Sequence, residues 1–221
     1  MDYLSFDVGI KNLAYCILTP EKKIVGWDII NLNKNPLCQI VLNKKCQKQA
    51  TYHVMDSEVD YCCTTHKEKC KKVKKIKKDN LFQLSQLCLQ ELIRINVSNV
   101  KYILIENQPV LKNPTMKSIQ MIIYTFFVLQ GVMNDSSTIK EVHMVNARNK
   151  LNVYKGPAVI CPYNDDKKNK YRKNKFLSIK YTEKMIQDDK EEFQELFKES
   201  KKKDDLADAY LQGIYWIQKS I

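Results

Sequence analysis

Apolar and polar positions alternate in three short runs at the start of the chain. Residues 3–8 alternate with a period of two, a polar turn follows, and a second apolar run covers 13–18. A third run covers 24–30 and places Val25 and Trp27 on a common face. Three such runs joined by polar turns predict an antiparallel meander of β-strands.

The second half of the chain shows helical periodicity. Apolar residues recur every three or four positions over 81–95, 116–127 and about 204–218, and weaker signals cover 176–199. Spacing of this kind predicts amphipathic helices. The apolar segment 115–132 is a candidate dimer face, although the same pattern is typical of a helix buried in the core.

Two further apolar runs predict strands between these helices. Residues 101–106 (KYILIE) are apolar enough for a buried central strand. Residues 141–145 are expected to form another strand, and the basic stretch 164–175 is expected to be a loop. Three strands followed by helix, strand, helix, strand and helix predict an α/β fold.

Residues 33–79 break this pattern, and we interpret them as an insertion into a domain formed by residues 1–32 and 80–221. The segment is polar, holds five of the eight cysteines and two of the three histidines, and closes with a lysine run. A segment this polar needs another source of stability than an apolar core, and metal binding is one such source.

The spacing of cysteines in the insertion indicates a zinc site. Cys38 and Cys46 are followed by the closer pair Cys63 and His66, which together offer three thiolates and one imidazole for a tetrahedral ion. A closed site of this kind would be structural. Other residues of the segment compete for these positions, namely Cys62, Cys70 and His53. A set of unligated thiols in a reducing cell is the simpler alternative.

The net charge of +12 and the isoelectric point near 9.2 favour a polyanionic partner. Each phosphate that Lys or Arg neutralises releases counterions, which drives binding to nucleic acids. A lysine-biased composition without a binding role is the alternative. A membrane surface would also suit the charge, but no apolar run reaches the length of about 18 residues that a membrane span needs.

The sequence shows no signal or transit peptide, because residues 2–8 are already predicted as a strand. We therefore expect an intracellular, reducing compartment, where metal binding or burial explains cysteines better than disulfides do.

Basic residues gather in two stretches. Residues 67–78 contain eight lysines in twelve positions, and residues 167–175 contain six basic residues around Tyr171. Such runs are often solvated faces or loops. In a protein that binds nucleic acid they would instead position DNA through its phosphates. The candidate DNA contacts in the two stretches are Lys72, Lys75, Lys168, Lys170, Arg172 and Lys173.

Four acids stand at the ends of predicted elements: Asp7, Glu106, Asp205 and Asp208. Each has an ordinary explanation alone, since Asp before Gly is typical of a turn, Glu after a strand can meet solvent, and Asp in a first helical turn stabilises the helix end. Together they offer the oxygen ligands that magnesium prefers. Two such ions roughly 3.5–4 Å apart can activate water and stabilise the leaving oxygen of a phosphodiester.

The segments that carry these acids, SFDVGIKN (5–12), IENQ (105–108) and DLADA (205–209), resemble the signature of RuvC-type Holliday junction resolvases in the ribonuclease H-like superfamily. The Ile-Glu-x-Gln form is similar to the poxvirus and fungal mitochondrial branch. The resemblance covers about residues 1–32 and 81 to the end. It implies a mixed sheet of five strands, the first three antiparallel, a homodimer, and paired symmetric nicks across a four-way DNA junction.

The resemblance also implies that Asp7, Glu106, Asp205 and Asp208 are the catalytic ligands of two Mg2+ ions, with Mn2+ as a substitute. Asp204 competes with Asp205, and the D-x-x-D spacing favours Asp205. Gln108 and its neighbour Asn107 are candidate contacts to the DNA backbone, or a strand-end cap before Pro109. Resolvases of this family do not, as a rule, carry the cysteine-rich insertion.

The expected function is therefore resolution of branched DNA by metal-dependent hydrolysis that leaves 5′-phosphate ends. The rival functions are a ribonuclease H-like nuclease for RNA–DNA hybrids or flaps, and a non-catalytic, zinc-stabilised DNA-binding protein. An RNA-binding factor is a third, although an aromatic platform motif that would support it is missing from the sequence pattern. The resemblance to viral resolvases suggests a large DNA virus that works in the host cytoplasm.

Overall fold

The computed structural model describes residues 1–220 except 34, 56, 78, 112 and 165. The chain divides into two compact units, which we describe separately. The α/β unit contains Met1–Leu32 and Leu84–Ile221, and the Cys-rich unit contains Asn33–Gln83. Lys78, the end of the predicted lysine run, lies outside the described residues.

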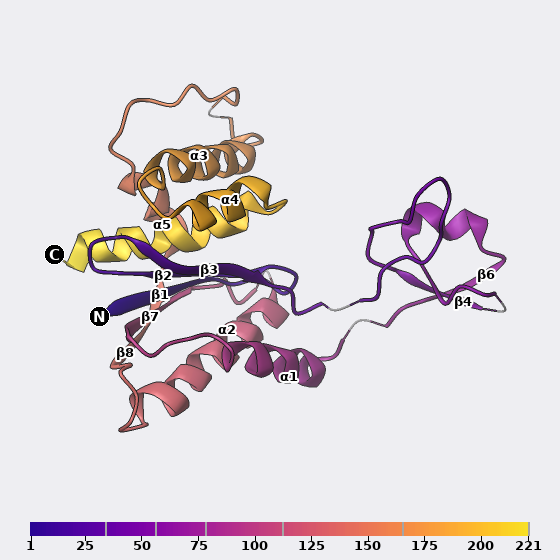
Figure 1. The fold of residues 1–221 in the computed structure, drawn as a ribbon, viewed down its shortest axis with the longest axis horizontal. Helices are drawn as coiled ribbons and strands as arrows, with labels where there is room; N and C mark the ends of the chain where they lie inside the picture. The colour runs from indigo at the N-terminus through magenta and orange to yellow at the C-terminus, as the bar shows by residue number, and fades with distance from the viewer. Residues whose placement is uncertain (34, 56, 78, 112, 165, 221) are drawn as a thin grey trace. The chain divides into compact units, whose positions relative to one another are not determined.

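A five-stranded sheet forms the centre of the α/β unit (Figure 1). Its strands, in the order in which they lie in the sheet, are β3 (Ile24–Ile30), β2 (Leu13–Leu18), β1 (Asp2–Asp7), β7 (Val100–Glu106) and β8 (Glu141–Val145). The pairs β1–β2 and β2–β3 are antiparallel, whereas β7 runs parallel to both β1 and β8. The predicted mixed sheet with three antiparallel strands at its start is confirmed.

Helices cover both faces of this sheet (Figure 1). On one face lie α1 (Leu81–Leu92) and α2 (Pro114–Phe127), and a π-helical turn, Val128–Val132, continues α2. On the other face lie α3 (Lys170–Met185), α4 (Glu191–Glu199) and α5 (Lys203–Ser220). The two layers enclose two separate cores, one on each side of the sheet.

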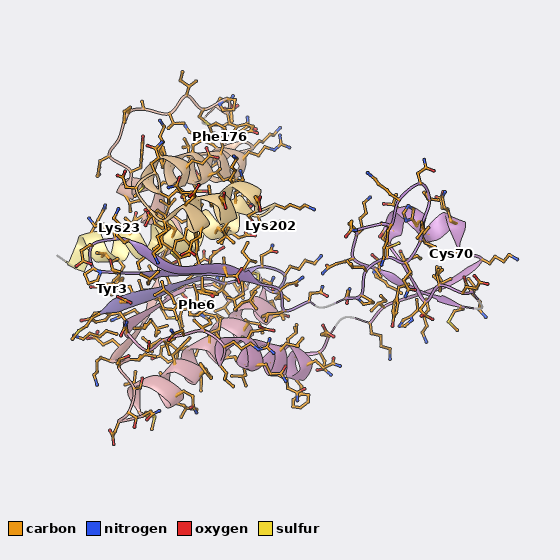
Figure 2. The ribbon with its side chains drawn as sticks, viewed as in Figure 1. Tyr3, Phe6, Lys23, Cys70, Phe176 and Lys202 are labelled. Carbon is orange, nitrogen blue, oxygen red and sulfur yellow. The ribbon has the colours of Figure 1, made fainter. Side chains whose placement is uncertain are left out.

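The central strand β1 contributes to both cores because its alternating side chains point to opposite faces. Leu4 and Phe6 pack with α1 and α2 (Figure 2), while Tyr3 packs with the α5 core. Ser5, on the α5 side, is fully buried although it is polar. A buried β1 holds the residue at its end, Asp7, in a fixed position.

Two sequence expectations for the α/β unit are wrong. The basic stretch 164–175 is not all loop, because α3 begins at Lys170; Lys and Arg are good helix formers, and this helix buries only Ser178 and Thr182. Val25 is 44% exposed instead of sharing the buried face of Trp27. The pairing shifts between Ile17 and Leu18, and this bulge turns Val25 outward.

The Cys-rich unit has a small antiparallel sheet of its own. Its strands β4 (Tyr52–Met55), β5 (Tyr61–Cys62) and β6 (Lys72–Lys75) lie in the order β5-β4-β6, and a 3-10 helix covers Thr64–Lys69. The small hydrophobic core of this unit contains Cys38, Val54, Cys62 and Cys63. The sequence pattern did not predict these strands. No helix in the described part of the chain is long and apolar enough to cross a membrane.

Candidate active site and metal centre

The sheet places Asp7 beside Glu106. Strands β1 and β7 are parallel neighbours in which Phe6 pairs with Ile105, so the next residue of each strand emerges at the same edge of the sheet. The two carboxyl groups share a hydrogen bond. Burial, followed by the charge of Glu106 and this hydrogen bond, raises the pKa of Asp7 well above its ordinary value.

Helix α5 brings Asp205 and Asp208 to the same edge. The side-chain amide of Gln212 donates hydrogen bonds to Ser5 Oγ (3.0 Å) and to the carbonyl oxygen of Phe6 (3.1 Å). One residue further, a Cβ on Gly213 would lie 2.5 Å from Leu18 Cδ1, so glycine lets α5 approach the sheet this closely without displacing the Leu18 side chain. Because Asp208 lies one turn before Gln212, the contacts that fix Gln212 also fix Asp208.

Two carboxylate oxygens at the site are buried without a hydrogen bond from the described part of the chain to offset their loss of contact with water. Among the described residues, neither Asp205 Oδ2 nor Asp208 Oδ1 has a hydrogen-bond partner. A buried acceptor without a partner is costly. Burial raises the pKa of Asp208, and burial together with the charge of Asp204 raises the pKa of Asp205 to about 6. Carboxylate oxygens left in this state fit the donor set of a hard divalent cation.

Lys150 lies among the acids of the site and was not predicted from the sequence. It comes from the 3-10 segment Ala147–Val153 after β8, is 17% exposed, and forms an ion pair with Asp208. Burial opposes its charge, but the acids Asp208 and Asp7 outweigh burial and hold the pKa of Lys150 above its ordinary value. No motif in the sequence distinguishes this lysine from its many neighbours.

Asp204 and Asp205 differ in their surroundings. Asp204 forms an ion pair with Lys175 from the first turns of α3, whereas Asp205 keeps a buried oxygen without a partner among the described residues. The first of the two acids is therefore already neutralised by the protein. The second is free to accept another positive charge.

Gln108 is directed into the site. Its side-chain amide donates to Glu106 Oε2 (2.6 Å) and to the carbonyl oxygen of Val8 (3.3 Å), and its backbone N–H donates to Gln120 Oε1 (2.8 Å). The neighbouring Asn107 is exposed and accepts a hydrogen bond from Lys117. Gln108 thus orients the Glu106 carboxylate.

The acids lie at a pocket of about 590 Å3 with basic side chains on its walls. The charged lining residues are Asp7, Glu106, Asp204, Asp205, Asp208, Lys11, Arg148, Lys150 and Lys175. Acids in the centre suit cations, and bases around them suit the phosphates of a nucleic acid.

The structure places the other candidate DNA contacts on both units. Lys168 precedes α3, and Lys170 and Arg172 lie exposed in its first turn, on the helix whose Tyr171 and Lys175 line the pocket. Lys173 is half-buried. Lys72 and Lys75 are exposed on β6 of the Cys-rich unit.

The Cys-rich unit brings together the four residues selected by spacing. The ligand atoms of Cys38, Cys46, Cys63 and His66 all lie within 4.8 Å of one another. His66 Nδ1 is 3.4 Å from Cys38 Sγ and 3.7 Å from Cys63 Sγ. Three sulfurs and one imidazole nitrogen this close together match the donor set of a structural zinc site.

The competing thiols of Cys62 and Cys70 are not among the four ligand atoms that gather within 4.8 Å of one another. Cys62 and Cys70 form a hydrogen bond with each other, and burial, followed by that bond, raises the pKa of Cys62 to about 12. In contrast, the pKa of Cys63 is lowered: burial opposes the shift, but the backbone N–H of His66 and the thiol of Cys38 outweigh it. A thiol that ionises readily is the better metal ligand. All eight cysteines are free.

A comparison of sequences finds a viral relative. The "Uncharacterized protein L451" of Acanthamoeba polyphaga mimivirus is 31% identical over 252 residues, which cover 94% of this chain and 60% of the viral protein. The chain thus spans three-fifths of the length of that relative. No protein-family model matches the chain.

Comparison with solved structures identifies the fold. The yeast mitochondrial Holliday junction resolvase Ydc2 aligns with a TM-score of 0.53 and 16% identity over 98% of this chain and 78% of its own. The fowlpox virus Holliday junction resolvase aligns with a TM-score of 0.52 and 17% identity over 99% of both chains. The chain therefore has the fold of RuvC-like Holliday junction resolvases, as the resemblance predicted.

Proposed function

We propose that this protein is a magnesium-dependent endodeoxyribonuclease that resolves four-way DNA junctions by paired, symmetric nicks. The observation that carries the proposal is the meeting of Asp7, Glu106, Asp205 and Asp208 in one pocket, where two buried carboxylate oxygens have no partner among the described residues. The fold shared with Holliday junction resolvases supports the choice of a branched substrate.

The four acids would hold the divalent ions. Bound there, two magnesium or manganese ions would activate water and stabilise the leaving 3′ oxygen of a phosphodiester. The ion pair between Asp204 and Lys175 supports Asp205, and not Asp204, as the ligand. Gln108 keeps the Glu106 carboxylate turned toward the site through its 2.6 Å hydrogen bond.

In this proposal Lys150 neutralises negative charge in the site. Its ammonium group neutralises Asp208 and lies close enough to Asp7 and Glu106 to feel their charges. It therefore holds mutually repelling acids together when metal is absent. With metal bound, the same ammonium group would be free to donate a hydrogen bond to the scissile phosphate, where negative charge increases during hydrolysis.

The DNA on either side of the cleaved bond would contact the basic residues around the pocket. Lys168, Lys170, Arg172 and Lys173 lie at the start of α3, the helix that also brings Lys175 and Tyr171 into the pocket. Contacts of this kind bind phosphates and position the duplex without reading its sequence. On the Cys-rich unit, the exposed Lys72 and Lys75 would provide further contacts to phosphates.

Paired nicks require two active sites, and an apolar groove supplies a candidate interface between two copies. The groove measures about 820 Å3 and lies between α1 and α2, and in it Ile93 is 71% and Leu129 52% exposed. Exposed apolar patches of this kind usually mark an interaction site. A four-way junction has two-fold symmetry, which a homodimer matches.

The Cys-rich unit would bind one structural zinc ion through Cys38, Cys46, Cys63 and His66. The proximity of the four ligand atoms supports this set. The free thiols are consistent with a reducing compartment, and the mimivirus relative supports a viral source, so we place the protein in the host cytoplasm.

Cleavage of a labelled synthetic four-way junction, with magnesium or with EDTA, tests the proposed activity. We expect symmetric nick pairs with magnesium, none with EDTA, and none for Asp208→Asn. An RNA–DNA hybrid and a linear duplex serve as competing substrates. Preferred cleavage of the hybrid would move the assignment to a ribonuclease H-like nuclease, and junction binding without cleavage would make the protein architectural.

A further inference from the structure

The sheet of the Cys-rich unit has two chemically different faces. Cross-strand partners point to the same side of an antiparallel sheet. One side carries Val54, Val73 and Cys62, which pack in the small core around the cysteine cluster. The residues of this inner face are apolar because they form the small core of the unit.

The outer face carries aromatic and basic side chains with no core to cover them. His53 of β4 pairs with Tyr61 of β5 on one side and with Lys74 of β6 on the other, and Lys72 pairs with Met55 next to them. All of these residues are exposed except Tyr61, which is half-buried. The rings of His53 and Tyr61 lie 4.6 Å apart, centroid to centroid.

This combination fits an unpaired nucleic-acid strand. Proteins that bind single strands pair aromatic side chains, on which bases stack, with lysines that follow the phosphates. A base inside a duplex is already stacked on both sides and cannot reach such rings. The unit as a whole favours a polyanion, because residues 33–83 contain twelve lysines and only five acidic residues.

We propose that the outer face of the β5-β4-β6 sheet binds single-stranded DNA. One or two bases would stack on Tyr61 and His53, and the adjoining phosphates would pair with Lys72 and Lys74. The proposed function supplies only the choice of DNA as the polymer. A chain that cuts branched DNA would use such a face to hold nucleotides that are unpaired at the branch.

Fluorescence anisotropy on the full-length protein tests this proposal. The probe is a labelled oligothymidylate of about 15 nucleotides, near the upper site size of single-strand binding domains, and a duplex of equal length is the comparison. Asp7→Asn is present throughout so that the DNA stays intact. We expect His53→Leu combined with Tyr61→Leu to weaken oligothymidylate binding at least about tenfold and to change duplex binding little.

The contribution of Lys72 and Lys74 is measured separately, through the salt dependence of binding. For Lys72→Gln combined with Lys74→Gln, the slope of log affinity against log salt should fall by about 0.7 for each lysine removed. The matched control is Lys184→Gln combined with Lys198→Gln, which removes the same charge from exposed positions of α3 and α4. Tyr61→Trp keeps a ring and should keep the affinity, so it tests stacking even if the double leucine variant fails to fold.

Three results would overturn the proposal: unchanged oligothymidylate binding by the ring variants, equal losses for oligothymidylate and duplex, or equally effective displacement of the oligonucleotide by polyglutamate. The last would point to an acidic protein partner. Junction cleavage is measured separately with Asp7 restored, so the two proposals can fail independently. A protein that cuts no junction yet loses single-strand binding in the ring variants would support the sheet face and refute the resolvase.

Discussion

At the residue scale, repulsion among buried acids determines how the candidate active site responds to protons and to metal. Asp7, Glu106 and Asp208 interact through their charges, and Lys150 is the base buried among them. Folding without metal therefore moves carboxylates out of water without enough positive charge to offset them. A divalent cation bound among these acids would offset the free-energy cost of burying their charges.

The pKa of Asp205 leads to a stability prediction for the metal-free protein. Folding raises this pKa from 3.8 to about 6, so the folded state binds the proton more tightly than the unfolded state does. The stability from this proton is fully present below pH 3.8 and is lost as the pH rises through about 6. In EDTA at pH 8, we expect Asp205→Asn to increase the free energy of unfolding by about 1 to 2 kcal/mol, less than the full pKa shift would give because Asp205 is partly exposed and solvent screens its charge.

Urea denaturation at pH 8 and pH 4 measures this effect. The gain should disappear at pH 4, where the wild-type carboxyl group is also neutral. Asp135→Asn, at an exposed loop position, is the control and should change little at either pH. A gain of equal size at both pH values would mean that the Asp205 carboxylate is not the source of the strain.

At the element scale, the strands and helices with a strong apolar pattern were predicted best from the sequence. The strands Leu13–Leu18, Ile24–Ile30 and Glu141–Val145 have the predicted bounds because runs of apolar residues between polar segments define them. Helix α3 was partly missed because it buries little, and the strands of the Cys-rich unit were missed because cysteines, not an apolar pattern, fill that core. The four acids were recognisable from where elements end, whereas Lys150 depends on tertiary packing alone.

The zinc proposal predicts that the Cys-rich unit depends on its metal. We expect one zinc ion per chain, and we expect Cys63→Ser to release it, because a hydroxyl is a poor substitute for a thiolate. Limited proteolysis should then cut within Asn33–Gln83 and spare the α/β unit, whose cores are separate. Cys161→Ser, at a half-buried position outside the cluster, should keep the zinc. Full zinc content in Cys63→Ser would refute the ligand set.

At the scale of the whole molecule, the proposed catalytic groups and many of the proposed DNA contacts lie on different units of the chain. The acids that would hold metal lie in the α/β unit, while the Cys-rich unit adds basic and aromatic surface without any residue of the acidic pocket. The apolar groove between α1 and α2 lies on the face of the sheet opposite α5. A second copy bound there would leave the α5 side of each protomer free for DNA.

This arrangement predicts that the groove controls the number of cuts. Ile93→Glu combined with Leu129→Glu places two charges on exposed apolar positions of the groove, and burying them in an interface would be unfavourable. We expect a monomer by analytical ultracentrifugation that nicks junctions singly instead of in pairs. Val25→Glu puts a charge on an exposed apolar residue of β3, outside the groove, and should remain a dimer. A wild type that cuts in pairs as a monomer would refute the need for an interface, and a groove variant that remains dimeric would place the interface elsewhere. Because metal-dependent nicking by the monomer should persist, the proposed catalytic acids and the proposed interface are tested by one experiment with two separate readouts.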